Sequence, residues 1–186
     1  DLANVLINRK VKHLIICGIN KLNSLEIFFE ILTANDFWNE LESIECFNFS
    51  LKDVISIINN ANLSKLRSIT LTVEGPEDKL GNDENAEIFS REITSVRHVD
   101  ISIMNPEEQN QVPNWVFQLI HVFPNVANLN IVLKERNVDL SGISSLQNLR
   151  SLSIICEKFE NCFELVKQLK MLPYLNEVDL SGRDDY

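Results

Sequence analysis

His98, Asp100 and Ser102 alternate along one short apolar stretch, and together they carry the three side-chain types of a hydrolase triad. Alternate residues of a strand lie on one face about 6.6 Å apart, so the aspartate would stand between the histidine and the serine. A triad needs the histidine in the middle, within hydrogen-bond reach of both partners. The order is therefore wrong for acyl transfer. We expect no enzyme here, and a hydrolase is kept only as a remote alternative.

Metal and cofactor chemistry also lack a suitable set of residues. His13 and His98 take equivalent places three strands apart, about 14 Å, which is too far for both to bind one metal ion. Five Gly residues leave no glycine-rich phosphate loop. The four cysteines are widely spaced, at Cys17, Cys46, Cys156 and Cys162. Because none of them forms a CxxC pair, we expect neither a zinc site nor a cofactor.

The composition favours a protein partner. The net charge is −10, and the 17 Lys and Arg residues are scattered, so nucleic-acid binding is not expected. No apolar run approaches the roughly 18 residues of a membrane helix. Four cysteines are too few for a disulfide scaffold, so we read reduced thiols and an intracellular protein, cytoplasmic or nuclear. The acidity serves solubility, or it recruits a partner with a basic surface.

One spacing recurs along the chain: an apolar residue is followed by a second three positions later and a third two positions after that. In residues 123–133 these are Val126, Leu129 and Ile131. The middle residue returns at intervals of roughly 23 to 30 residues, a period typical of solenoids. The alternation predicts a strand in each copy. The seven expected strands lie near 13–17, 43–47, 68–72, 98–102, 128–132, 151–155 and 177–181.

Helical stretches separate most of these copies. Helices are expected at 24–34, 51–61, 113–122 and 159–171, and residues 142–147 are expected to form only a turn of helix. We therefore predict one α/β repeat array over 1–186. Its first residues look like the tail of a helix whose strand lies upstream, so we expect the array to belong to a longer chain.

Copies such as FPNVANLNIVL, LQNLRSLSI and LPYLNEVDL resemble the leucine-rich-repeat family, and the resemblance covers nearly the whole chain. Repeat length and helices are most similar to the long, ribonuclease-inhibitor-like type of F-box substrate receptors and NOD-like receptors. This sequence departs from the family where Asn or Cys usually follows the strand. The resemblance implies a solenoid with about seven parallel strands on a concave face, helices on the convex face, and a role in protein binding.

Strand alternation places the residues beside each middle apolar position on the concave face. The candidate protein-binding residues there are Ile15, Cys17, Glu45, Phe47, Thr70, His98, Asp100, Asn130 and Asp179. Two polar loops after the third and fourth strands are expected to form an acidic rim at one edge. Its residues are Glu74, Glu77, Asp78, Glu107 and Glu108. Solvated loops are the alternative interpretation of this rim.

Two roles follow from the resemblance. The first is the recognition domain of an adaptor such as an F-box ubiquitin-ligase substrate receptor. The second is the regulatory or ligand-sensing repeat region of a NOD-like immune receptor. In either role the partners are another protein and the rest of the same chain at one or both ends.

Overall fold

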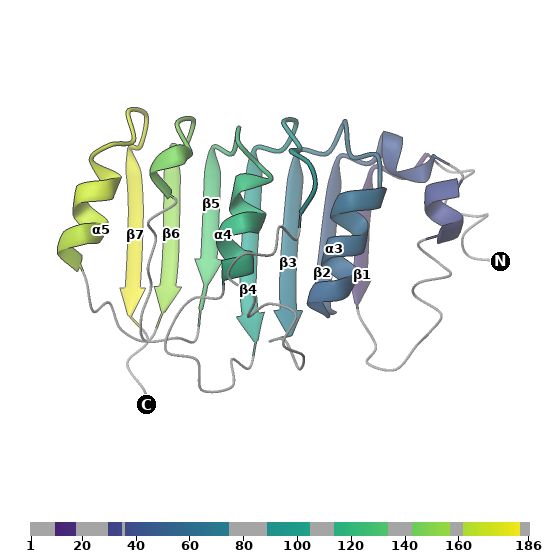
Figure 1. Cartoon of the computed structure of the whole chain (residues 1–186), viewed down its shortest axis with the longest axis horizontal. Helices are drawn as coiled ribbons and strands as arrows, with labels where there is room; N and C mark the ends of the chain where they lie inside the picture. The colour runs from purple at the N-terminus through teal and green to yellow at the C-terminus, as the bar shows by residue number, and fades with distance from the viewer. Residues whose placement is uncertain are drawn as a thin grey trace.

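Seven strands form one parallel sheet in which each strand lies beside its neighbours in sequence, from β1 to β7 (Figure 1). The computed structural model describes residues 10–17, 30–34, 36–74, 89–104, 114–133, 143–156 and 162–182. The strands are β1 His13–Cys17, β2 Ser43–Phe49, β3 Ser68–Glu74, β4 His98–Met104, β5 Asn128–Val132, β6 Ser151–Cys156 and β7 Glu177–Gly182. Each begins where the repeated spacing predicts it. The sheet is open, with β1 and β7 as its edges.

Alternation along each strand divides the sheet into a core face and an open face. The middle apolar residues Ile44, Ile69, Val99, Leu129 and Leu152 are all buried. The residues two positions further on are buried as well: Cys46, Leu71, Ile101, Ile131 and Ile154. Removing such a continuous apolar layer from water is the main force that holds a stacked array together.

The last strand breaks this pattern. Val178 and Leu180 occupy the same register rows as Leu152 and Ile154, yet they are 44% and 39% exposed. The repeated spacing predicts both as core residues, and that expectation is wrong for this strand. As an edge strand, β7 has a paired neighbour on one side only, which leaves these residues open to solvent, whereas Leu14 of the other edge strand, β1, is 8% exposed.

The described helices occupy the connections between strands. They are α3 Leu51–Asn60, α4 Asn114–His121 and α5 Cys162–Leu169, with short 3-10 turns η1 Phe37–Glu40 and η3 Ile143–Ser145. Figure 1 shows α3 and α4 on the same side of the sheet. The single turn η3 confirms the expectation for 142–147, and residues 30–34 are the described part of the helix expected at 24–34. No helix in the described segments is long and apolar enough to cross a membrane.

Helix α3 begins at a capping residue. The Ser50 hydroxyl oxygen accepts a hydrogen bond from the backbone N–H of Asp53 at 3.2 Å and donates one to the Asp53 carboxylate at 2.6 Å. These bonds satisfy one of the free N–H groups of the first turn and place a carboxylate there. The buried side chains Val54, Ile57 and Ile58 then face the sheet core.

A local irregularity ends β2. Asn48 has a positive φ of 56°, and the pairing with β3 shifts between Cys46 and Phe49, so that Phe49 lies opposite Val73. Simple alternation would place Phe49 on the open face with Phe47. The left-handed residue instead turns Phe49 into the core, where it is 1% exposed. The end of β2 therefore departs from the predicted alternation.

Candidate functional site

The open face of the sheet carries one continuous row of side chains, here called the central row. Its members are Cα partners from each strand to the next: Ile15, Glu45, Thr70, Asp100, Asn130, Ser153 and Asp179. The strand spacing of about 4.8 Å gives the row a length of roughly 29 Å. The register thus places six of the candidate residues predicted from alternation in this row, with His98 in the row that precedes it and Cys17 and Phe47 in the row that follows.

The middle of the central row holds a small polar cluster. Nε2 of His98 lies 3.0 Å from Oδ2 of Asp100, and the Thr70 hydroxyl donates to the same carboxylate oxygen at 3.5 Å. Both His98 and Asp100 are partly exposed. The histidine therefore has its carboxylate partner, but none of the described residues places a hydroxyl on its other ring nitrogen. This is the orienting half of a triad without a nucleophile.

Asn130 extends this cluster toward β5. It is the register partner of Asp100, and its side-chain oxygen is buried without a hydrogen-bond partner among the described residues. A buried amide oxygen without a donor is uncommon in folded proteins. The partly exposed Asp100 carboxylate is therefore the acceptor that a partner can reach at the centre of the open face.

The β1 end of the open face is apolar. Ile15 is 63% exposed, Cys17 is exposed, and its register partner Phe47 is half-buried. The predicted acidic rim is different, because most of it lies outside the described residues. Glu74 ends β3 beside Met104 at the end of β4, as expected for neighbouring strand ends. Glu77, Asp78, Glu107 and Glu108 fall in the segments that the structure does not describe.

The opposite edge of the sheet, where the strands begin, has its own regular order. The residue just before each of the strands β1 to β6 accepts two backbone hydrogen bonds from the next strand entry: the carbonyl of Arg67, for example, accepts from the N–H groups of Arg97 and His98. We call this set the entry row. From β1 to β7 it consists of Lys12, Glu42, Arg67, Arg97, Ala127, Arg150 and Asn176.

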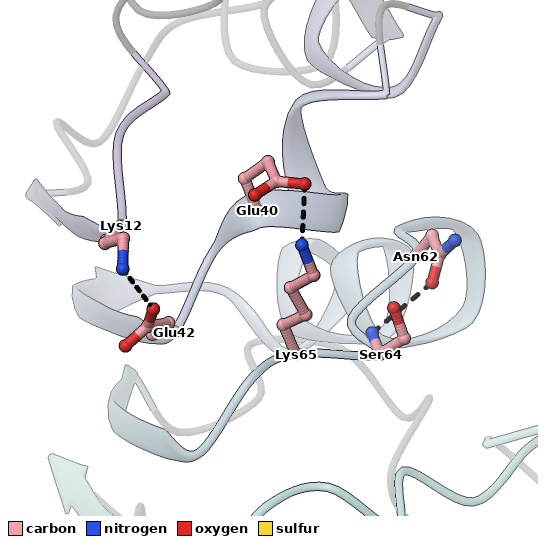
Figure 2. Close-up of polar contacts among 6 residues, drawn as sticks. All are labelled: Lys12, Glu40, Glu42, Asn62, Ser64 and Lys65. Atoms are coloured by element: carbon pink, nitrogen blue, oxygen red, sulfur yellow. Dashed lines mark hydrogen bonds and ion pairs between the residues drawn. The ribbon is translucent and has the colours of Figure 1, made fainter.

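Paired charges occupy the β1 end of the entry row. The Lys12 ammonium donates to the Glu42 carboxylate at 2.7 Å, and beside it Lys65 donates to Glu40 at 2.7 Å (Figure 2). These hydrogen bonds, with the attraction between opposite charges, lower the pKa of Glu42 and of Glu40 and raise the pKa of Lys12. Because all four groups are exposed, such pairs add little to folding, but they leave this end electrically balanced.

The other end of the entry row is basic and was missed by the sequence analysis. Arg67, Arg97 and Arg150 stand in one row, so the expectation that basic residues are scattered is wrong at this edge. The signal was present in the sequence, because each arginine directly follows the first apolar residue of its copy, as in LRS, VRH and LRS. The repeated apolar spacing does not predict this arginine row, because the arginines lie just before the strands and outside their alternation.

The described residues hold no cluster of three or more His, Cys, Asp or Glu side chains that could bind a metal ion. Cys17, Cys46 and Cys156 carry free thiols, and burial raises the pKa of the Cys46 thiol to about 12, with a further contribution from the Asp53 carboxylate. Comparison of the chain with protein-family models, with curated proteins and with solved structures finds no match. The residues of this chain therefore carry the functional argument.

Proposed function

We propose that this chain is a leucine-rich-repeat solenoid that binds another protein through its open face and has no catalytic role. The observation that carries the proposal is the central row, which runs unbroken across seven strands and offers Glu45, Asp100 and Asp179 as carboxylates. A row of roughly 29 Å matches a protein surface better than a small molecule. Its three carboxylates favour a partner with a basic surface.

Within this proposal, the recognition domain of an adaptor, such as an F-box ubiquitin-ligase substrate receptor, is our first choice. The regulatory repeat region of a NOD-like immune receptor is the second. Both rest on the resemblance of the repeats, and the flanking sequence separates them. An F-box-like helical segment upstream supports the adaptor, whereas a nucleotide-binding domain with a phosphate loop upstream supports the receptor.

The experiment starts from a photo-crosslinking residue placed at Ser153, which is half-buried in the central row. The crosslinked protein is identified, and its Kd is measured for the wild type and for the triple variant Glu45→Lys, Asp100→Lys, Asp179→Lys. Loss of three complementary charges should weaken binding about tenfold or more. Because charges that remain partly exposed act mainly on association, the wild-type association rate should also fall as salt is added.

The matched control is Glu30→Lys, Glu92→Lys, Glu164→Lys, which makes the same change in net charge at positions outside the central row. It should keep the Kd within about twofold of the wild type. Equal losses in the two triple variants would mean that net charge, not the open face, governs binding. Unchanged binding by a folded open-face variant would refute the proposal.

The hydrolase alternative is tested at the same face. If His98 and Asp100 acted on an ester or amide, His98→Ala would abolish turnover of that substrate while circular dichroism stayed unchanged. Under the proposal, no hydrolysis depends on either residue, and His98→Ala alters only partner binding.

A further inference from the structure

A groove of about 770 Å³ lies along the entry edges of β4 to β7. Most of its lining comes from the segments that lead into these strands, and Asn128, the first residue of β5 and the register partner of His98, joins it from the open face. The other lining residues are Arg97, Arg150, Asn125, Asn148, Ala127 and Tyr174. The segments that lead into β4, β5, β6 and β7 all belong to the described part of the chain. This groove adjoins the open face at Asn128, contains no residue of the central row, and is not used by the proposed function.

Arg97 is fixed at one side of the groove. Its Nη1 donates to three backbone carbonyls, those of Thr94 at 2.6 Å, Val96 at 3.0 Å and Asn125 at 3.4 Å. These bonds hold the planar guanidinium by one nitrogen and leave its other N–H groups without a partner among the described residues. A guanidinium held in this way is preorganised to donate to an oxyanion.

Arg150 faces the groove from the other side. Neither it nor Arg97 forms an ion pair within the described segments, whereas Lys12 and Glu42 of the same row pair with each other. Screening limits electrostatic interaction to about 8 Å at physiological salt, so these two cations can attract an anion despite the overall charge.

Ala127 separates the two arginines in the entry row. Its N–H donates to the carbonyl of Arg97, and its own carbonyl accepts from the N–H of Arg150. Two strand spacings therefore put the two arginine Cα atoms about 9.6 Å apart. The methyl group of alanine leaves the space between the guanidinium stems open, and a larger side chain there would fill it.

This spacing matches one backbone conformation of a peptide. In a polyproline II helix, residues three apart lie on the same side and are about 9.3 Å apart. Carboxylates at such positions would each meet one arginine when the peptide lies along the entry row. Tyr174, 62% exposed at the β7 end, offers an aromatic surface of the kind that packs against proline rings.

From these observations we infer that the groove binds a proline-rich acidic peptide in which two carboxylate residues stand three positions apart. Arg97 and Arg150 each take one carboxylate, Ala127 provides the floor between them, and Tyr174 packs against the proline that follows. Nucleic acid fits poorly, because the long phosphate chain would be repelled by the acidic remainder of the molecule.

The probe is a fluorescent hexapeptide of prolines with glutamates at its second and fifth positions, titrated with the protein by anisotropy. We expect saturable binding that weakens as salt is raised from 50 to 200 mM. A peptide of equal charge with glutamates at the second and fourth positions should bind about tenfold more weakly, since one carboxylate then points away. A version with glutamine at both positions should not bind.

The protein variants are Arg150→Gln and, as a matched control in the same row outside the groove, Arg67→Gln. Loss of a charge-assisted contact should raise the Kd about tenfold or more for Arg150→Gln, while Arg67→Gln stays within about twofold. Ala127→Leu fills the floor without changing charge and should weaken binding to a similar degree. Arg97→Gln is less informative alone, because it also removes three contacts to carbonyls.

Three results would overturn the inference. One is no binding of the first peptide by the folded wild type at millimolar concentration. Another is equal binding of the two glutamate spacings, and the third is equal losses in Arg150→Gln and Arg67→Gln.

A hexapeptide with phosphoserine in place of both glutamates tests the other oxyanion: tighter binding of that peptide by more than tenfold would replace the carboxylate ligand with a phosphorylated one. The open-face variants should bind all these peptides normally.

Discussion

Cys17 and Cys46 lie on neighbouring strands but face opposite sides of the sheet, and this determines their chemistry. Cys17 is exposed on the open face, whereas Cys46 is fully buried in the core and burial holds its pKa near 12. At pH 8 a thiol of that pKa is ionised in about one molecule in ten thousand, and only the thiolate reacts readily. Inaccessibility slows its reaction further.

We therefore predict that iodoacetamide at pH 8 alkylates Cys17 in the folded protein within minutes and leaves Cys46 unmodified. In 6 M guanidinium both should react at similar rates. Peptide mapping by mass spectrometry assigns each site, and Cys17→Ser removes the fast site as a control. Comparable labelling of the two cysteines in the native protein would contradict the burial of Cys46.

At this scale, the sequence predicted which residues share a row but not which of them touch. Alternation alone placed Glu45, Thr70 and Asp100 side by side, because backbone register depends on the apolar frame. It could not predict that His98 would turn to Asp100, since two rotamers of a surface histidine differ by little energy. The burial of the Asn130 side-chain oxygen also depends on a rotamer, so the sequence pattern could not predict it.

The end of β2 shows how one residue changes an element. Asn48 adopts φ 56°, a region that costs most residues about 1–2 kcal/mol and that Asn and Gly tolerate best. That conformation directs Phe49 into the core and brings Ser50 to the start of α3, where it caps the helix. The alternation of ECFNF reads as an ordinary strand, so this turn could not be predicted from the pattern.

Substitution of Asn48 tests this. Asn48→Val should lower the free energy of unfolding by about 1–2 kcal/mol, because a β-branched side chain clashes in the left-handed region. Asn48→Gly should change it by no more than about a few tenths, since glycine accepts this conformation. Urea denaturation followed by circular dichroism measures both. If valine and glycine were equally well tolerated, the positive φ would not be required.

The arginines at the entry edge of the sheet are the second feature that the sequence pattern did not predict. The apolar residues that repeat along the chain lie inside the strands and predict only the strand positions. Arg67, Arg97 and Arg150 lie one step earlier, where the chain enters each strand, and repeated backbone hydrogen bonds align them as regularly as the sheet does. The order was thus predictable in principle, whereas the anchoring of Arg97 by three carbonyls was not.

On the scale of the whole molecule, burial decreases toward the last strand. Leu152 of β6 is fully buried, and Leu180 of β7, although on the same face, is 39% exposed. The repeated spacing assigns both to the core face, because a sequence pattern carries no information on whether neighbouring residues cover a strand. The middle of the array should therefore contribute more to stability than its β7 end.

Matched leucine truncations measure this difference. Leu152→Ala should lower the free energy of unfolding by about 2–5 kcal/mol, since it opens a cavity in a closed core. Leu180→Ala should cost less than about 1 kcal/mol, because much of that side chain already contacts water. Denaturation of the two variants under identical conditions gives the comparison. Equal losses would indicate that Leu180 is covered in solution.

The order of the sheet also bears on how such a gene can change. Every strand pairs only with its neighbours in sequence, so an in-frame deletion of one strand with its connection would leave the remaining hydrogen-bond rows able to rejoin. Losing the β5 unit would keep the fold and the alternation of the core. It would also bring Arg97 and Arg150 onto adjacent strands, halving their spacing and closing the groove. Recombination that removes one such segment would therefore change the ligand of the proposed groove and preserve the order of the sheet.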